Sequence, residues 1–127
     1  EEWVARLPQS PNLTAICEPD PTSRVRNLDR NAFVLCMTMG HRTDRPILEE
    51  IFRQGRQFPY LGVIGSQAKR KVLLRELKAA GISEDVASQF HCPIGIDIGT
   101  NQPGEIAISV AAQLLAERGR LWEVDAT

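Results

Sequence analysis

Three stretches of the sequence carry polar and flexible residues of the kind that bind ligands, and the first is TMGHRTD, residues 38–44. It follows an apolar run and offers the Thr38 hydroxyl, the His41 imidazole and the Asp44 carboxylate on a loop that leads into a helix. Backbone N–H groups at a helix start bind anions, and His41 can donate a hydrogen bond or carry a proton. Alternatively, Thr43 or Asp44 only caps the helix while His41 is solvated. The residue types leave both interpretations open.

The second stretch is IGSQAKR, residues 64–70. Gly65 and Ser66 end an apolar run and place the free N–H groups of the next helix at the carboxyl edge of a strand. Lys69 and Arg70 follow within the first helical turn, where a cation opposes the helix dipole at a cost of about 0.3–1 kcal/mol unless an anion lies nearby. The stretch is either a phosphate-binding turn or a tight strand-to-helix corner followed by a solvated basic face, and composition alone does not decide between them.

The third stretch is HCPIGIDIG, residues 91–99. Its spaced glycines, Gly95 among them, allow a ligand to approach the backbone closely. Cys92 is a thiol that could touch a cofactor, although buried cysteines are more often inert small hydrophobes. Asp97 either binds a ligand hydroxyl or satisfies N–H groups of its own loop, and the second interpretation is favoured.

These residues predict binding more than catalysis. No Ser/His/Asp order, paired carboxylates or Walker motif is present. The three cysteines, Cys17, Cys36 and Cys92, are widely spaced and without a Cys-x-x-Cys pair, which favours free thiols in a reducing compartment over a disulfide framework or a zinc site. We therefore expect a cytoplasmic protein with no bound metal, in which Cys17 and Cys36 belong to the core.

The apolar runs predict the elements that hold these stretches. We expect buried strands at residues 13–17, 32–38 and 60–65, because these runs lack alternation. Helices are expected from Thr43 or Asp44 to about Gln54, from Ser66 to about residue 80, in a short piece after Ser83, and over residues 103–119. The last helix is apolar around most of its circumference, which predicts that it is buried. Strands alternating with helices predict a partial Rossmann-like α/β fold, a three-layer sandwich with a mostly parallel sheet.

Composition further narrows the functional classes to which the chain could belong. The chain has 127 residues, about one domain, with 43% hydrophobic residues and a net charge of −1. This charge argues against a broad nucleic-acid interface, which needs an excess of Lys and Arg. No apolar run reaches the roughly 18–20 residues of a membrane-spanning helix.

Three segments, AFVLCMTMGHRTDRPIL, FPYLGVIGSQAKRKVLLREL and HCPIGIDIGTNQPGEIAISVAAQLLAERG, together resemble the C-terminal Rossmann-like domain of the XdhC/CoxI family. The resemblance covers nearly the whole chain and keeps the order and spacing of the segments. It implies a non-catalytic accessory protein, a chaperone that binds the molybdenum cofactor (molybdopterin) as a transient ligand. It also implies two partners, a cysteine desulfurase that sulfurates the cofactor and a xanthine dehydrogenase-type apoenzyme that receives it. Family members are generally described as dimeric or oligomeric.

The resemblance also implies which residues bind the cofactor. Cofactor-binding positions carried over from the family motifs, together with those indicated by the residues themselves, are Thr38, His41, Asp44, Gly65, Ser66, Lys69, Arg70, Cys92 and Gly95. Two positions depart from the family pattern. Met39 and Gly40 replace a first histidine and its neighbour, and Gln113 replaces an acid in the last helix, a change expected to be neutral.

The resemblance places residues 1–127 as the C-terminal domain without the first β-α-β unit of the Rossmann fold. We therefore expect a sheet edge at residues 13–17 or 32–38 to be covered by a second copy or by the missing part of the protein, because a bare hydrophobic edge promotes association. Two other functions stay open, an NAD(P)-dependent oxidoreductase domain and a protein-docking module that binds no cofactor. The motif G-x-G-x-x-G, which would favour the oxidoreductase, is absent from the chain.

Overall fold

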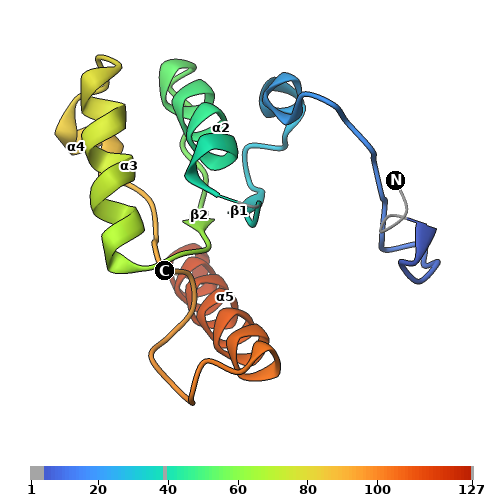
Figure 1. The fold of residues 1–127 in the computed structure, drawn as a ribbon. Coiled ribbons are helices and arrows are strands. Elements are labelled where there is room, and N and C mark those ends of the chain that lie inside the picture. The colour runs from blue at the N-terminus through green and yellow to red at the C-terminus, as the bar shows by residue number, and fades with distance from the viewer. Residues whose placement is uncertain (1–4, 39, 127) are drawn as a thin grey trace.

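The computed structural model describes residues 5–38 and 40–126, with the side chains of residues 41 and 122–126 outside the description. The elements follow the chain in the order η1 (Pro21–Asn27), β1 (Phe33–Cys36), α2 (His41–Arg53), β2 (Tyr60–Val63), α3 (Gln67–Ala79), α4 (Glu84–Ala87) and α5 (Pro103–Ala126). Helices α2 and α3 lie on one side of the strands and α5 lies on the other (Figure 1). The predicted α/β class and Rossmann-like layering are confirmed.

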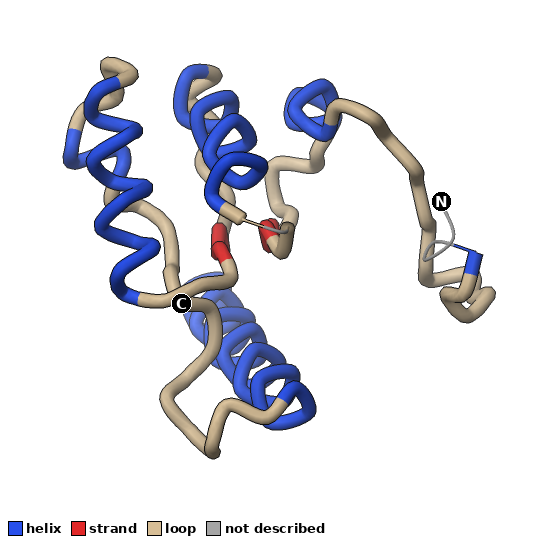
Figure 2. Tube along the Cα trace, viewed as in Figure 1, coloured by secondary structure: helices blue, strands red, loops and turns tan. Residues whose placement is uncertain are grey.

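The sheet is small and parallel, and Figure 2 shows how little of the chain it occupies. β1 pairs with β2 from Phe33 opposite Tyr60 to Cys36 opposite Val63. A third chain segment continues the sheet beyond β2, because the Val63 N–H donates to the His91 carbonyl and the His91 N–H donates to the Leu61 carbonyl, both at 2.8 Å. Three loops therefore leave the same carboxyl edge, which is where open parallel sheets bind ligands.

Local signals explain where α3 begins and ends. Ser66 is its N-cap, and the Ser66 hydroxyl accepts a hydrogen bond from the Lys69 N–H at 3.2 Å. Gly81 follows the helix with a φ of +91°, a conformation that favours glycine. Both ends match the prediction.

The start of α2 differs from the prediction. The helix begins at His41 after Gly40, so neither Thr43 nor Asp44 caps it. Asp44 lies inside the first turn with its side chain fully buried, where it contacts other parts of the protein. The capping interpretation of Asp44 is therefore wrong, because the carboxylate has stronger long-range partners than the local N–H groups.

The predicted strand at residues 13–17 is also wrong. Leu13, Ile16 and Cys17 are exposed, and within the described residues this segment makes only an isolated antiparallel bridge between Ser10 and Leu13. It runs away from the sheet, as Figure 1 shows for the chain before η1. An apolar run forms a strand only where a neighbouring strand accepts its hydrogen bonds, and here none does. Cys36, in contrast, is buried as expected.

Helix α5 is covered on one face only, which corrects the prediction that it is buried. Ile108 is 64% exposed and Leu115 is 56% exposed. The opposite face contacts the sheet and the preceding loop through residues such as Ser109 and Gln113. No helix among the described residues is long and apolar enough to cross a membrane.

The core lies between the strands and the helices α2 and α3. Its fully buried side chains are Leu48, Ile51, Val63, Leu73 and Leu77. Arg56 holds the η1 segment against this core. Its guanidinium donates to the carbonyls of Val25 at 2.9 Å and Leu28 at 2.5 Å, and it lies over the Phe58 ring.

Candidate functional site

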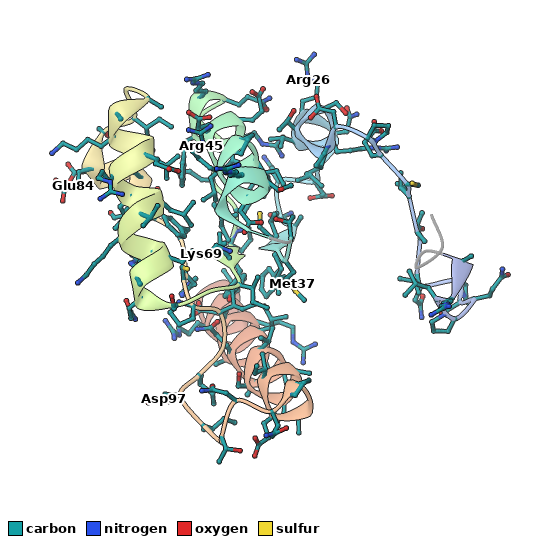
Figure 3. All side chains as sticks on the ribbon, viewed as in Figure 1. Arg26, Met37, Arg45, Lys69, Glu84 and Asp97 are labelled. Atoms are coloured by element: carbon teal, nitrogen blue, oxygen red, sulfur yellow. The ribbon has the colours of Figure 1, made fainter. Side chains whose placement is uncertain are left out.

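A cavity of about 770 Å³ lies at the carboxyl edge of the sheet. One wall is the turn between β2 and α3, residues 64–67, and the other is the loop of residues 90–98 together with the first turns of α5. Isoleucines from the turn, the loop and α5 give the cavity apolar surfaces, while Asp97, Asn101 and backbone groups give it polar ones. In Figure 3, Asp97 lies on this loop where it projects away from the strands. Apolar surfaces combined with polar groups are found in small-molecule sites.

The turn between β2 and α3 presents the positive end of a helix to the cavity. Gly65, Ser66 and Gln67 line it, and the first turn of α3 contains no acidic residue. Gly65 is required for a steric reason, since a Cβ there would clash with the side chain of Lys69. The backbone at this turn can thus donate hydrogen bonds to an anionic group.

Gly95 determines the shape of the opposite wall. Its φ is +95°, and a Cβ at this position would clash with the Ser109 hydroxyl. The Gly95 N–H donates to Gln113 Oε1 at 2.8 Å, and the same oxygen accepts from the Tyr60 hydroxyl at 2.5 Å. Gln113 therefore joins the loop to α5 and β2. Burial, assisted by the Glu117 charge, raises the pKa of Tyr60 to about 12, so the hydroxyl remains a donor at neutral pH.

Cys92 lies in the cavity wall as a neutral thiol. It is buried and lies 3.7 Å from the Ser66 carbonyl, measured from its sulfur atom. Burial raises the pKa of the thiol, and the nearby charges of Lys69 and Arg70 only partly oppose this effect. A protonated thiol is a poor nucleophile, so Cys92 can contact a ligand but is not activated to attack one.

Arg70 is the cationic side chain that lines the cavity. Its guanidinium donates to the Phe90 carbonyl at 2.7 Å and lies over the Phe90 ring, with 5.0 Å between the guanidinium carbon and the ring centroid. These contacts hold the side chain between α3 and the loop that forms the opposite wall.

Thr38, Asp44 and Lys69 come together in a separate network. The Thr38 hydroxyl donates to Asp44 Oδ1 at 2.6 Å, and Lys69 Nζ donates to Asp44 Oδ2 at 2.6 Å. The Asp44 side chain is 0% exposed and the Lys69 side chain 17%. None of the three residues lines the cavity. Burial, together with the Asp44 charge and partly offset by Lys69, raises the pKa of the neighbouring Cys36 to about 12.

The structure thus divides the predicted site residues into two groups. Gly65, Ser66, Arg70, Cys92 and Gly95 line the cavity. Thr38, Asp44 and Lys69 form the buried network beside it, and the side chain of His41 lies outside the described residues.

Two residues that shape the site were not among the predicted site residues. Gln113 supplies the acceptor oxygen that holds Gly95. The acid of the family pattern could accept the same bond, so the expectation that this change is neutral stays a prediction. Glu105 accepts hydrogen bonds from Thr100 and from the Gln102 N–H, which lower its pKa and cap α5. An acid three residues after the N-cap position is the sequence signal for the capping role of Glu105. Among the described residues, no group of three His, Cys, Asp or Glu side chains is placed to hold a metal ion.

Comparison with known proteins places this site in a family. A family model described as the XdhC Rossmann domain matches residues 3–114. Over 83 residues the chain is 37% identical to the protein YqeB of Escherichia coli (strain K12), covering 65% of this chain and 15% of the relative. It is 32% identical over 84 residues to a probable xanthine dehydrogenase subunit of Bacillus subtilis (strain 168), covering 66% and 23%. It is 26% identical over 98 residues to the molybdenum cofactor insertion chaperone PaoD of Escherichia coli (strain K12), covering 77% and 30%. The chain therefore spans less than a third of the length of each of these relatives.

Proposed function

Because the chain belongs to the XdhC Rossmann-domain family, we propose that it is the cofactor-binding part of an accessory protein for molybdenum enzymes. In this proposal the cavity binds the molybdenum cofactor, and the protein passes it to an apoenzyme of the xanthine dehydrogenase type. The relatives named as a molybdenum cofactor insertion chaperone and as a probable xanthine dehydrogenase subunit support this assignment. We retain the assignment of the chain to the C-terminal Rossmann-like domain, supported by the extent of the family match.

The observation that carries the proposal is the chemistry of the cavity. Its volume of about 770 Å³ falls within the range of roughly 300–1,000 Å³ that is usual for small-molecule sites. The apolar walls can contact a flat pterin ring, and Asp97 and Asn101 can bond its polar edge. The start of α3 and Arg70 can receive a phosphate at the other end. The two glycines whose Cβ atoms would clash, Gly65 and Gly95, keep the backbone close to this space.

In this proposal the described residues that line the cavity bind and shield the ligand. When bound, the cofactor supplies the molybdenum centre that the target enzyme uses for hydroxylation. Isoleucines on the loop exclude water from the apolar part of the cavity. The Cys92 thiol stays protonated because burial raises its pKa. This supports the role of a non-enzymatic carrier whose ligand is held by reversible contacts.

We further propose that the cofactor is sulfurated by a cysteine desulfurase while this protein holds it. The support is family membership, together with a cavity that opens to solvent next to the loop of residues 90–98. We also propose that the protein works as a homo-oligomer or together with further sequence. Support comes from the exposed Ile108 and Leu115 on α5 and from β1, which pairs on one side only among the described residues. A cytoplasmic location is part of the same proposal.

The test is capture of the cofactor by the purified chain. The protein is incubated anaerobically with molybdenum cofactor, repurified, and assayed for bound pterin by oxidation and fluorescence. Wild-type protein is expected to retain pterin, and Ser66→Trp, which fills the cavity, is expected to lose it. Lys71→Trp is the matched control, because Lys71 is an exposed residue of α3 outside the cavity lining.

Equal retention by wild-type protein and the Ser66→Trp variant would remove this site from the proposal. Absence of retention by wild-type protein would remove the proposed function. Titration of the same samples with NADH, followed by nicotinamide fluorescence, tests the oxidoreductase alternative, and pull-down of the apoenzyme by protein that retains no pterin would favour the docking module.

A further inference from the structure

The ammonium group of Lys69 joins the two strand-to-helix turns. Lys69 Nζ donates to Asp44 Oδ2 at 2.6 Å and to the Ile64 carbonyl at 2.5 Å. Asp44 belongs to α2, which follows β1, whereas Ile64 belongs to the turn that follows β2. One partly buried cation thus connects the start of α2 to the turn that lines the cavity. Figure 3 shows Lys69 beside the strands, between α3 and the neighbouring β1–α2 unit.

Gly65, the glycine of this turn, leaves room for the Lys69 side chain. A Cβ at Gly65 would clash with the Lys69 side chain, so the aliphatic part of Lys69 lies directly against the turn. The Ile64 N–H donates to the Cys36 carbonyl at 2.9 Å, which continues the pairing of β2 with β1. Both polar groups of the Ile64 backbone are therefore bonded within the protein, which fixes the residue that leads into the turn.

We propose that Lys69 is a positioning residue for the cavity, and this inference rests on the proposed function. Lys69 does not contact the ligand. Lys69 holds the Ile64 carbonyl, and Asp44, which accepts a hydrogen bond from Thr38, holds Lys69. Together they set the direction in which the turn presents its N–H groups. This assigns Lys69 a different role from Arg70, which lines the cavity itself. The neighbouring cations of the motif therefore have separate functions.

Two fluorescent pterins test these roles, one carrying a terminal phosphate on its side chain and the other identical but without the phosphate. Each is titrated into the 127-residue wild-type chain and into the variants Lys69→Met, Asp44→Asn and Arg70→Met, well below their unfolding temperatures. Lys69→Met is expected to weaken the phosphate-bearing pterin about tenfold, which is typical of residues that orient a binding group from behind, because the turn N–H groups that receive the phosphate are no longer held in place. Asp44→Asn keeps Lys69 but removes the charged partner that holds it, and is expected to weaken the same pterin. Arg70→Met is expected to weaken the phosphate-bearing pterin more than the other. Lys69→Arg keeps a cation that can donate to both Asp44 and the carbonyl, and is expected to recover part of the affinity.

Arg56→Met is the matched control for the loss of structure alone. Arg56 is also a cation that donates to backbone carbonyls, but those of Val25 and Leu28, outside the cavity lining. The affinity of Arg56→Met for both pterins should match that of wild-type protein. If Lys69→Met weakens the phosphate-bearing pterin but Asp44→Asn leaves it unchanged or strengthens it, Lys69 contacts the phosphate itself and the inference is overturned. Unchanged affinity for both pterins in Lys69→Met overturns it as well.

Amide hydrogen exchange keeps the inference testable if wild-type protein binds neither pterin, a result that would count against the proposed function. In the absence of ligand, the Ile64 and Gly65 amides are expected to exchange faster in Lys69→Met than in wild-type protein. The same amides should be unaffected in Arg56→Met. Equal exchange in Lys69→Met and wild-type protein would show that Lys69 does not hold the turn.

Discussion

The two strand-to-helix turns of this molecule are built alike but use their polar groups in opposite ways. After β1, the Thr38 hydroxyl and the Asp44 carboxylate turn inward and are satisfied by each other and by Lys69. After β2, Gly65 and Ser66 lie at a cavity of about 770 Å³. Both turns lie at the carboxyl edge of the sheet, where ligands are expected. The position of a polar residue at this edge therefore does not by itself make it a ligand contact.

The two turns differ in the partners of their polar groups. Asp44 is fully buried, and a buried carboxylate requires a cation and hydrogen bonds. Lys69 supplies the charge from 25 residues farther along the chain. The second turn contains no carboxylate, and α3 has no acid in its first turn, so no acidic side chain there competes for its N–H groups, although the Lys69 N–H already donates to the Ser66 hydroxyl. The first turn is thus a support, and in the proposed function the second is the binding surface.

The largest expected effect on stability concerns the turn after β1. Asp44→Asn leaves the Lys69 charge without its buried partner and is expected to lower the free energy of unfolding by about 3–5 kcal/mol. Urea unfolding measures the change. Combining Asp44→Asn with Lys69→Met should restore part of the loss, because the two residues act as a pair. Glu49→Gln, which removes an exposed ion pair with Arg53, is the control and should change stability by less than about 1 kcal/mol. A loss this small in Asp44→Asn would mean that the first turn is not held by a buried ion pair.

The next effect is a loss of stability at alkaline pH. Burial first, and then the Asp44 charge, raises the pKa of Cys36 to about 12. An unfolded thiol titrates near pH 8.5, so above that pH the unfolded chain releases a proton that the folded chain keeps. Stability is therefore expected to be constant below about pH 8 and to fall as pH rises toward 12, by on the order of 2 kcal/mol at pH 10.

Urea unfolding at a series of pH values measures this slope, and two cysteine variants identify its source. Cys36→Ala should make the slope shallower, whereas Cys17→Ser should not, because Cys17 is exposed. Equal slopes in wild-type protein and Cys36→Ala would show that Cys36 is not buried beside the network.

The smallest expected effect concerns the cap of the second turn. Ser66→Ala removes the acceptor for the Lys69 N–H and is expected to cost about 1 kcal/mol of unfolding free energy. Ser83→Ala is its matched control, because Ser83 is the N-cap of α4 but its side chain makes no cap hydrogen bond. A difference between these variants in thermal or urea unfolding measures the contribution of the Ser66 hydroxyl. Equal stabilities would show that the hydroxyl does not cap α3.

Local signals predicted the part of the fold that forms the second turn. The apolar run before Gly65, the cap Ser66 and the stop at Gly81 each act over a few residues, and β2 and α3 form as expected. Residues 13–17 have an equally apolar run but find no neighbouring strand within the described chain. The coverage of α5 likewise depends on what packs beside it, so Ile108 is exposed despite its apolar surroundings in sequence.

The sequence indicated several of the residues that line the cavity or lie beside it, but it did not indicate the role of each residue. The sequence pattern indicated Lys69 and Asp44 separately, but a pairing between residues of different helices has no local signal. The same holds for Gln113, whose side chain reaches Gly95 and Tyr60 only because α5 packs under the sheet. Roles that depend on distant partners therefore become visible only in the folded structure.

The most direct test of the difference between the turns is hydrogen exchange measured by mass spectrometry, with and without molybdenum cofactor under anaerobic conditions. We predict that the cofactor slows exchange in peptides covering residues 64–70 and 91–101, which border the cavity. Peptides covering residues 40–44 should exchange at the same rate in both samples. Protection of residues 40–44 without protection of the cavity peptides would contradict the division into a support and a binding surface, as would unchanged exchange throughout.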